Sequence, residues 1–134
     1  MYNNTVSYNY IETMLKTLKS EGIKLGVVSN KFDLAVKELC KKYYDGLVDI
    51  AIGQGGDVLP KPLPFGVYKA MKELGADKAS TIYVGDSEVD VQTAQNANIP
   101  CIGVTWGFRG RAYLDGADYI IDDPCEIINI VRGK

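Results

Sequence analysis

Histidine is absent from this chain of 134 residues, and its absence excludes several kinds of catalytic site. No Ser-His or Cys-His pair can activate a nucleophile, and the commonest ligand of transition metals is missing. Cysteine is scarce as well. Cys40, Cys101 and Cys125 lie far apart and form no CxxC pair, which argues against a structural zinc site. Each of the three is expected to be a small, buried hydrophobic residue.

Positive charge is not in surplus, because 15 lysines and arginines are outnumbered by 17 aspartates and glutamates. A net charge of −2 does little to neutralise a polynucleotide backbone, so no nucleic-acid partner is expected. No apolar run is long enough to span a membrane, and the first ten residues lack the charged and apolar regions of a secretion signal. Together with an odd number of cysteines, these features predict a cytoplasmic protein.

Apolar residues make up 46% of the chain and recur in two patterns. Short apolar runs predict buried strands at 24–29, 48–52, 81–84, 101–104 and 119–121. Helical spacing predicts helices at 10–21, 65–74 and 88–97, one after a capping Asp33, and a last one with Pro124 at its first position. This alternation predicts a Rossmann-like α/β fold, with a parallel sheet and helices on both faces, formed by 1–134 as a single domain.

Polar residues follow the first two predicted strands, at the edge where such sheets bind ligands. Ser29 and Asn30 end the first strand, and a hydroxyl with the N–H groups of a tight turn can hold phosphate oxygens. A turn that caps the next helix would explain the same pair. Lys61, in the run LPKPLP, offers an ammonium ion that could neutralise a phosphate, although a solvated surface lysine is the simpler interpretation.

The run YVGDSEVD, around the end of the third strand, is the most informative stretch of the chain. Asp86 and Asp90 are four residues apart, so they lie near one face once a helix begins. Two like charges at the end of a buried strand are tolerated when a cation or a lysine lies between them. Mg²⁺ suits one or two carboxylates together with phosphate oxygens. Alternatively, Asp86 caps the helix and Asp90 is solvated on its surface.

The series VVSN, KPLP and VGDSEVD resembles the second, third and fourth motifs of the haloacid dehalogenase-like hydrolases. Among these enzymes the chain looks most like the phosphoglycolate phosphatase branch, and the resemblance covers nearly all of it, from Tyr10 to Val131. The resemblance implies a Mg²⁺-dependent phosphatase of small phosphorylated metabolites. Phosphoryl transfer depends mainly on positioning and charge neutralisation, which suits the polar residues at the strand ends.

Roles for individual residues follow from this resemblance. Ser29 and Asn30 would bind the phosphoryl group, and Lys61 would neutralise it and position the nucleophile. Asp86 would bind Mg²⁺, and Asp90 would orient Lys61 or belong to the metal shell. The expected catalytic residues are thus Lys61 and Asp90, the phosphate ligands Ser29, Asn30 and Lys61, and the metal ligands Asp86 and Asp90.

One family motif is missing from this sequence. Members carry a DxDxT motif on their first strand, whose first aspartate attacks phosphorus, and no DxD occurs in these 134 residues. The cap domain that usually follows that motif is missing too. The expected protein is therefore the C-terminal part of a hydrolase core, truncated and inactive by itself. The alternative is a non-catalytic phosphate-binding or dimerising remnant of the same family, so its status as an enzyme stays open.

The missing strand has a physical consequence for the sheet. In the family it lies between the strand that ends in Ser29 and the strand that ends in Asp86, so both strands lose a neighbour. Unpaired strand edges seek partners, because buried N–H and C=O groups without partners cost about 1–3 kcal/mol each. Three arrangements are expected: direct pairing of the two strands, a strand from a second copy in a homodimer, or a strand from a complementing N-terminal half.

Overall fold

The computed structural model of the chain describes residues 8–32, 34–35, 37–38, 41, 46–55, 58–105, 112 and 114–133. Helices and strands alternate along these residues. The helices are α1 (Tyr8–Ser20), α3 (Phe65–Leu74), a short 3₁₀ helix (Lys78–Ser80), α4 (Glu88–Ala97) and α5 (Cys125–Arg132). The strands are β1 (Gly26–Phe32), β2 (Ile50–Gln54), β3 (Tyr83–Gly85), β4 (Cys101–Val104) and β5 (Tyr119–Ile121). The helix expected after Asp33 lies largely outside the described residues.

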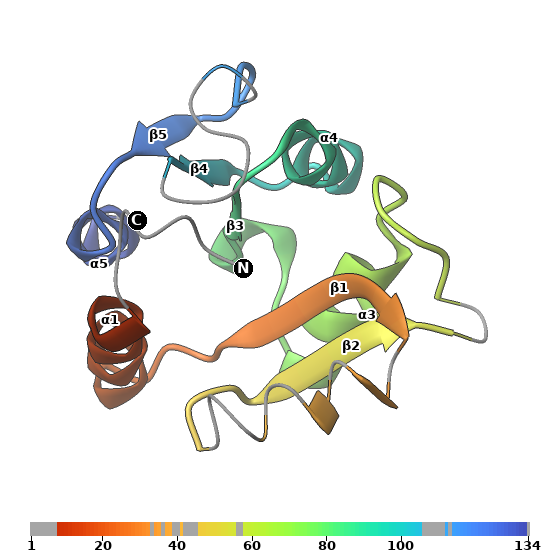
Figure 1. The fold of residues 1–134 in the computed structure, drawn as a ribbon, viewed down its shortest axis with the longest axis horizontal. Helices are drawn as coiled ribbons and strands as arrows, with labels where there is room; N and C mark the ends of the chain where they lie inside the picture. Colours follow the sequence, from red (N-terminus) through yellow and green to blue (C-terminus); the bar gives the residue numbers. More distant parts are fainter. Residues whose placement is uncertain are drawn as a thin grey trace.

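All strand pairs are parallel, and they form two sheets (Figure 1). β1 pairs with β2, and β3, β4 and β5 form a second sheet in that order. In the described part of the chain no ladder joins β1 to β3. The predicted parallel α/β fold is therefore confirmed. Of the three arrangements expected for the orphaned strands, direct pairing of β1 with β3 is wrong for this chain by itself.

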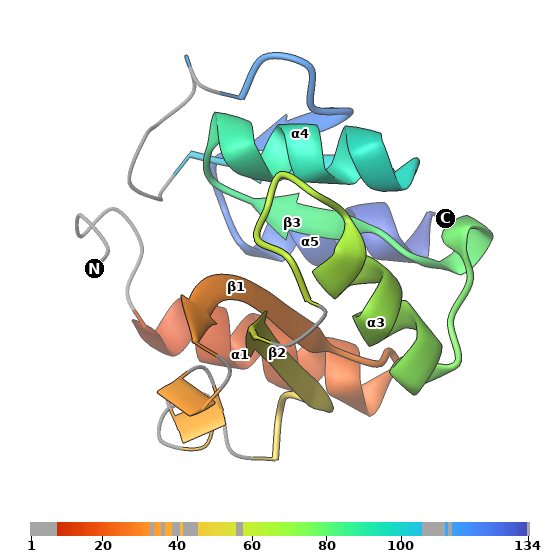
Figure 2. The same ribbon diagram turned by 90° about the vertical axis from the view of Figure 1, so that its right-hand side faces the viewer.

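Helices cover both faces of the second sheet, as the alternation of side chains on β4 shows. Successive residues of a strand point to opposite faces. Ile102 and Val104 belong to a buried cluster with Met14 and Leu18 of α1, on the side where α1 and α5 lie next to each other (Figures 1 and 2). Cys101 belongs to a cluster on the other side, with residues of α3 and α4.

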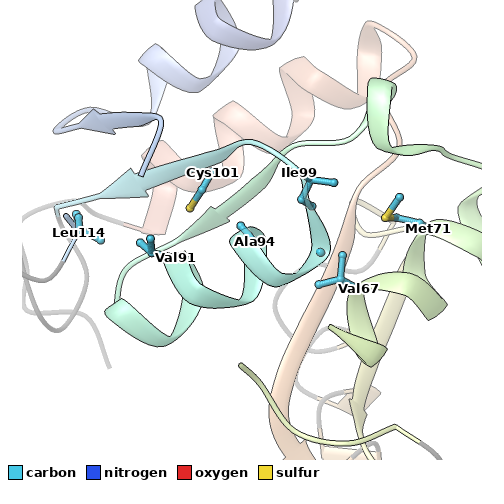
Figure 3. Packing of buried hydrophobic residues seen from close by; sticks show 8 residues of the cluster. Val67, Met71, Val91, Ala94, Ile99, Cys101 and Leu114 are labelled. Carbon is cyan, nitrogen blue, oxygen red and sulfur yellow. The ribbon is translucent and has the colours of Figure 1, made fainter. Parts of the chain in front are cut away.

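Helix α3 links the two sheets through adjacent faces of its surface. Ala70 packs with Ile52 of β2 in a small buried cluster that Val28 of β1 also contacts. Val67 and Met71 instead pack toward α4 and β4 (Figure 3). Because β1 and β3 are not paired, such side-chain packing connects the two sheets in place of backbone hydrogen bonds.

Element boundaries agree with the sequence predictions most closely for helices. α3 and α4 have the predicted limits, and Gly75 ends α3 in the left-handed conformation (φ 68°) that favours glycine. β1 begins later than predicted, at Gly26, and also ends later, because its pairing with β2 resumes at Phe32 after an irregularity. Pro124 precedes α5 as its N-cap instead of occupying its first position. No helix in the described residues is long and apolar enough to cross a membrane.

Candidate functional site

The irregular end of β1 is bonded to the loop that contains Lys61. Pairing with β2 is regular up to Val28 and resumes only at Phe32, so Ser29 and Asn30 lie in a bulged segment. Bulges redirect side chains and are common next to active sites. The Asn30 side chain accepts a hydrogen bond from the Lys61 backbone N–H (2.7 Å) and donates one to the Lys61 carbonyl (3.4 Å). The backbone of Lys61 is thereby held against the carboxyl end of β1.

The Lys61 side chain forms an ion pair with Asp90 of α4. Its Nζ lies 2.7 Å from Asp90 Oδ1, and the two side chains are 16% and 9% exposed. This burial argues against the interpretation of Lys61 as a solvated surface lysine. Asp90 as a whole is only 6% exposed, so the solvated alternative for this residue is wrong. The pair also joins the two sheets at their carboxyl edge, since Lys61 is bonded to β1 and Asp90 follows β3.

Four donors surround the Asp90 carboxylate. Lys61 and the Tyr83 hydroxyl (2.9 Å) donate to Oδ1. The Asp86 backbone N–H (3.0 Å) and the Ser87 hydroxyl (3.2 Å) donate to Oδ2. A carboxylate offers about four lone-pair sites. The carboxylate is therefore saturated, and its orientation is set from four directions.

The local sequence explains why Asp90 can occupy this place. Ser87 is the N-cap of α4, with extended backbone (φ −143°), and its hydroxyl accepts from the Asp90 N–H. The alternative in which Asp86 caps this helix is therefore wrong, because the cap is the next residue. Asp90 is the third residue of the helix and folds back over Gly85. A Cβ on Gly85 would lie 2.2 Å from the Cβ of Asp90, so only glycine fits there.

Electrostatics keep Asp90 ionised and Tyr83 protonated. Burial, the largest single effect, opposes ionisation of Asp90, but the Lys61 ammonium and the hydrogen bonds from Lys61, Asp86 and Tyr83 outweigh it. The pKa of Asp90 is therefore below its ordinary value. Burial, and then the charge of Asp90, raise the pKa of Tyr83 far above its ordinary value. At neutral pH the Tyr83 hydroxyl is consequently a donor to a carboxylate.

Ser29 lies in the bulged part of β1, just after its regular pairing with β2 ends at Val28, and Asp86 lies just after β3. Ser29 directly precedes Asn30, and Asp86 directly follows Gly85, the last residue of β3; both are partly buried. The polar chain Asn30–Lys61–Asp90 connects the two edges. Four of the predicted site residues are thus linked by hydrogen bonds or the ion pair, and Ser29 is adjacent to them in the chain.

A magnesium ion fits this site only in part. Asp86 supplies a carboxylate at the strand end, a ligand of the kind Mg²⁺ prefers. Asp90 has both oxygens engaged by donors, which favours the first of its two predicted roles, the orientation of Lys61. Within the described ranges, no three acidic, cysteine or histidine residues gather as a metal cluster. These residues would therefore bind Mg²⁺ through Asp86 together with water and phosphate oxygens.

Three contributions to this site were missed by the sequence analysis. Ser87 could have been found, since serine followed three residues later by an acid is typical of a helix N-terminus. Tyr83 offered a weaker signal, because a tyrosine in a buried strand usually needs a hydrogen-bond partner. The contact between the Asn30 side chain and Lys61 had no local signal, since 31 residues separate the two.

Proteins of known sequence resemble this chain. A family model described as haloacid dehalogenase-like hydrolase matches residues 2–104. Phosphoglycolate phosphatase of Neisseria meningitidis serogroup A is 38% identical over 117 residues, which cover 85% of this chain and 49% of that protein. Pyrophosphatase PpaX of Bacillus mycoides is 30% identical over 127 residues, covering 92% and 59%. The chain spans about half the length of the curated relatives that it matches.

Solved structures resemble it as well. A protein of Lactobacillus delbrueckii subsp. bulgaricus, named as a candidate phosphoglycolate phosphatase, superposes with a TM-score of 0.88 at 36% identity, covering 92% of this chain and 52% of that one. A haloacid dehalogenase-superfamily hydrolase of Geobacter sulfurreducens gives a TM-score of 0.74 at 25% identity, covering 90% and 58%. Since the family model matches more than half of the 134 residues, this chain belongs to the haloacid dehalogenase-like hydrolases.

Proposed function

We propose that this chain is the phosphate-binding part of a Mg²⁺-dependent phosphatase that acts on small phosphorylated metabolites. The observation that carries the proposal is the buried pair between Lys61 and Asp90 (2.7 Å), placed between the bulged end of β1 and the start of α4. An ammonium held beside strand ends, in a family of hydrolases, suits the neutralisation of a phosphoryl group. The similarity to phosphoglycolate phosphatases and pyrophosphatases supports this substrate class.

In this proposal each polar residue has a defined task. Lys61 neutralises the phosphoryl group, Ser29 and Asn30 hydrogen-bond its oxygens, and Asp90 holds the Lys61 ammonium in place. Asp86 holds Mg²⁺, which when bound would draw negative charge from the phosphoryl oxygens. No DxD sequence supplies an attacking carboxylate in these 134 residues, so the chain by itself is expected to bind phosphate without turnover.

Binding and turnover can be measured separately. Inorganic phosphate with Mg²⁺ should shift the amide NMR signals of Ser29, Lys61 and Asp86, and Lys61→Met should weaken binding at least about tenfold, since it removes a charge-assisted contact. The matched control is Lys69→Met, a change at an exposed lysine of α3. Equal phosphate affinity in the Lys61→Met and Lys69→Met variants would contradict the proposed site.

Hydrolysis assays decide how complete the site is. The isolated chain is expected to leave 2-phosphoglycolate and pyrophosphate intact in the presence of Mg²⁺. Hydrolysis that disappears in Asp86→Ala would show that the chain is catalytically complete and that the proposed lack of activity is wrong. Phosphate binding without hydrolysis would also fit the non-catalytic alternative, which the partner experiment below separates from a divided enzyme.

The proposed partner is a complementing polypeptide that adds a parallel strand between β1 and β3. β3 is the strand of its sheet that lies nearest to β1, and neither edge is paired with the other (Figure 1). Val84, in the middle of β3, is 42% exposed. By contrast, every residue of β4, the strand that pairs with β3, is buried. A strand between them would bury Val84 and satisfy both edges.

Co-expression tests this partner. The polypeptide added is the part of the Neisseria meningitidis relative that this chain does not match. A complex is expected in which the amides of β1 and β3 gain protection from hydrogen exchange and phosphatase activity appears. A stable homodimer of this chain that protects the same amides and excludes the added polypeptide would favour the dimerising alternative.

The same proposal places the protein in the cytoplasm as a single hydrolase core domain. Support comes from the sequence, with three cysteines that form no CxxC pair, and from Cys101, a buried free thiol next to the site. Fractionation of cells that produce the tagged protein would test this location, and recovery in the culture medium would contradict it.

A further inference from the structure

Tyr83 shares an oxygen of Asp90 with the proposed phosphate-binding lysine. Its hydroxyl donates to Asp90 Oδ1 at 2.9 Å, the same atom that Lys61 contacts at 2.7 Å. Its ring is partly buried against the cluster that contains Val91 and Cys101. The backbone of Tyr83 is fixed by its pairing with Cys101 of β4. The hydroxyl therefore approaches the carboxylate from a rigid strand.

We propose that Tyr83 is a positioning residue, which holds the Asp90 carboxylate in the orientation that fixes the Lys61 ammonium at the carboxyl edge of the sheets. The positioning of Lys61 by Tyr83 and Asp90 is inferred from their hydrogen bonds alone. Its use in phosphate binding rests on the proposed function. The family motifs that predicted the site do not include this tyrosine.

The other contacts of Asp90 explain why a further donor matters. The Asp86 N–H and the Ser87 hydroxyl donate to Oδ2. Both residues directly precede α4, the helix that carries Asp90, so these two donors would move together with Asp90. Among the residues that the structure describes, the donors to Oδ1 are Lys61 and Tyr83. The Lys61 ammonium sits on a flexible four-carbon stem, whereas the Tyr83 ring is held by packing. Tyr83 is thus the donor that ties Oδ1 to the sheet.

A purely structural role is the competing explanation. A buried phenol needs a hydrogen-bond partner, and Asp90 would then satisfy Tyr83 without any effect on Lys61. The two explanations differ in what happens at Lys61. Tyr83→Phe keeps the ring and its packing but removes the donor. A structural role predicts changes in stability alone, while a positioning role also predicts a changed environment of the Lys61 ammonium.

The test compares Tyr83→Phe with the wild-type chain by NMR, without any ligand. In the wild type the ¹⁵N signal of the Lys61 ammonium should be visible, because its ion pair slows exchange with water. In Tyr83→Phe this signal should be lost or strongly broadened. Inorganic phosphate should then bind about fivefold more weakly.

The matched control for Tyr83→Phe is a second tyrosine of the same sheet. Tyr119→Phe makes the same chemical change at an exposed tyrosine of β5, on the outer edge of the sheet, and should alter none of these signals. An unchanged Lys61 ammonium signal in folded Tyr83→Phe would overturn the proposal. Absence of phosphate binding in the wild type would instead count against the proposed function and would leave the Lys61 ammonium signal decisive for Tyr83.

Discussion

At the scale of single residues, the site depends on how closely Asp90 approaches the turn before its helix. Its carboxylate lies over Gly85 and accepts from the N–H of Asp86. This contact is available only because Gly85 has no side chain. A glycine in the run YVGDSEVD is therefore needed for space, and its φ is not in the left-handed region.

Gly85→Ala is expected to destabilise the fold by about 2–3 kcal/mol, since overpacking at a backbone contact forces α4 to shift. The added methyl group would meet Asp90 Cβ at 2.2 Å, Cγ at 2.5 Å and Oδ2 at 2.7 Å. Urea unfolding measures the loss. Gly133→Ala serves as control, because its methyl group would meet only carbonyl oxygens at 3.6 and 3.7 Å. Similar stabilities of the two variants would show that Asp90 moves away at little cost.

The two described cysteines should differ in reactivity. Burial, with the charges of Asp90 and Asp118, raises the pKa of Cys101 to about 12, and the residue is 1% exposed. Cys125 is exposed. Iodoacetamide at pH 8 is therefore expected to modify Cys125 in the folded chain and Cys101 only after unfolding, since the thiolate is the reactive form. Peptide mass spectrometry reads the result, and rapid native labelling of Cys101 would contradict the burial described here.

At the scale of elements, the start of α4 combines capping and site construction. Ser87 accepts from the Asp90 N–H and donates to the Asp90 carboxylate, so one side chain both starts the helix and orients the acid. The negative charge of Asp90 in the first turn is also favourable at a helix N-terminus. The helix and the site are thus coupled through a single turn.

Ser87→Ala is expected to cost about 1 kcal/mol of stability, the usual effect of losing an N-cap. Ser87→Thr keeps the hydroxyl and should stay within about 0.5 kcal/mol of the wild type. Thermal unfolding of the two variants measures the difference. Equal losses in both would indicate that backbone crowding, and not the hydroxyl, determines the effect.

At the scale of the whole molecule, two parallel sheets are joined by packing and by one buried ion pair. α3 packs on β1 and β2 with one face and toward α4 with the adjacent face, while Lys61 and Asp90 connect the sheets near their carboxyl ends. Neither connection includes a backbone ladder. The stability of the assembly should therefore respond to conditions that break the ion pair.

Acid is the simplest such condition. The pKa of Asp90 is lowered in the folded chain below its ordinary value of 3.8, so the unfolded chain binds more protons as the pH falls. The contribution of Asp90 is present above about pH 4 and is lost as the pH falls through its folded pKa. Urea unfolding from pH 7 to pH 3 should show this loss. Asp49, whose pKa is lowered by its hydrogen bond with Lys19, adds a smaller effect because it is more exposed.

Asp90→Asn separates the contribution of Asp90 to acid sensitivity from that of Asp49. The variant should be less stable than the wild type at pH 7 by about 3 kcal/mol, since Lys61 loses its buried partner. It should also lose less stability on acidification, because the titrating carboxyl group is gone. Asp115→Asn, in an exposed turn, is the matched control. Parallel stability curves for wild type and Asp90→Asn would contradict the assignment of acid sensitivity to this pair.

The sequence by itself determined the order and type of the elements and the strand ends that carry the polar residues. These depend on local patterns, such as the valine-rich run of β1, the glycine that ends α3 and the run around Asp86. Such patterns act over a few residues, because backbone conformation and capping are local. They also identified the family, since its motifs are short contiguous runs.

Only the tertiary structure decided which side chains meet. Asn30 contacts Lys61 across 31 residues, and Lys61 contacts Asp90 across 29. The division into two sheets and the contact of Tyr83 with Asp90 likewise depend on how α3, α4 and the strands pack. Sequence periodicity does not predict these contacts, because they depend on how segments far apart in the chain pack together. The sequence therefore pointed to the edge of the sheet, and the packing made a single polar network there.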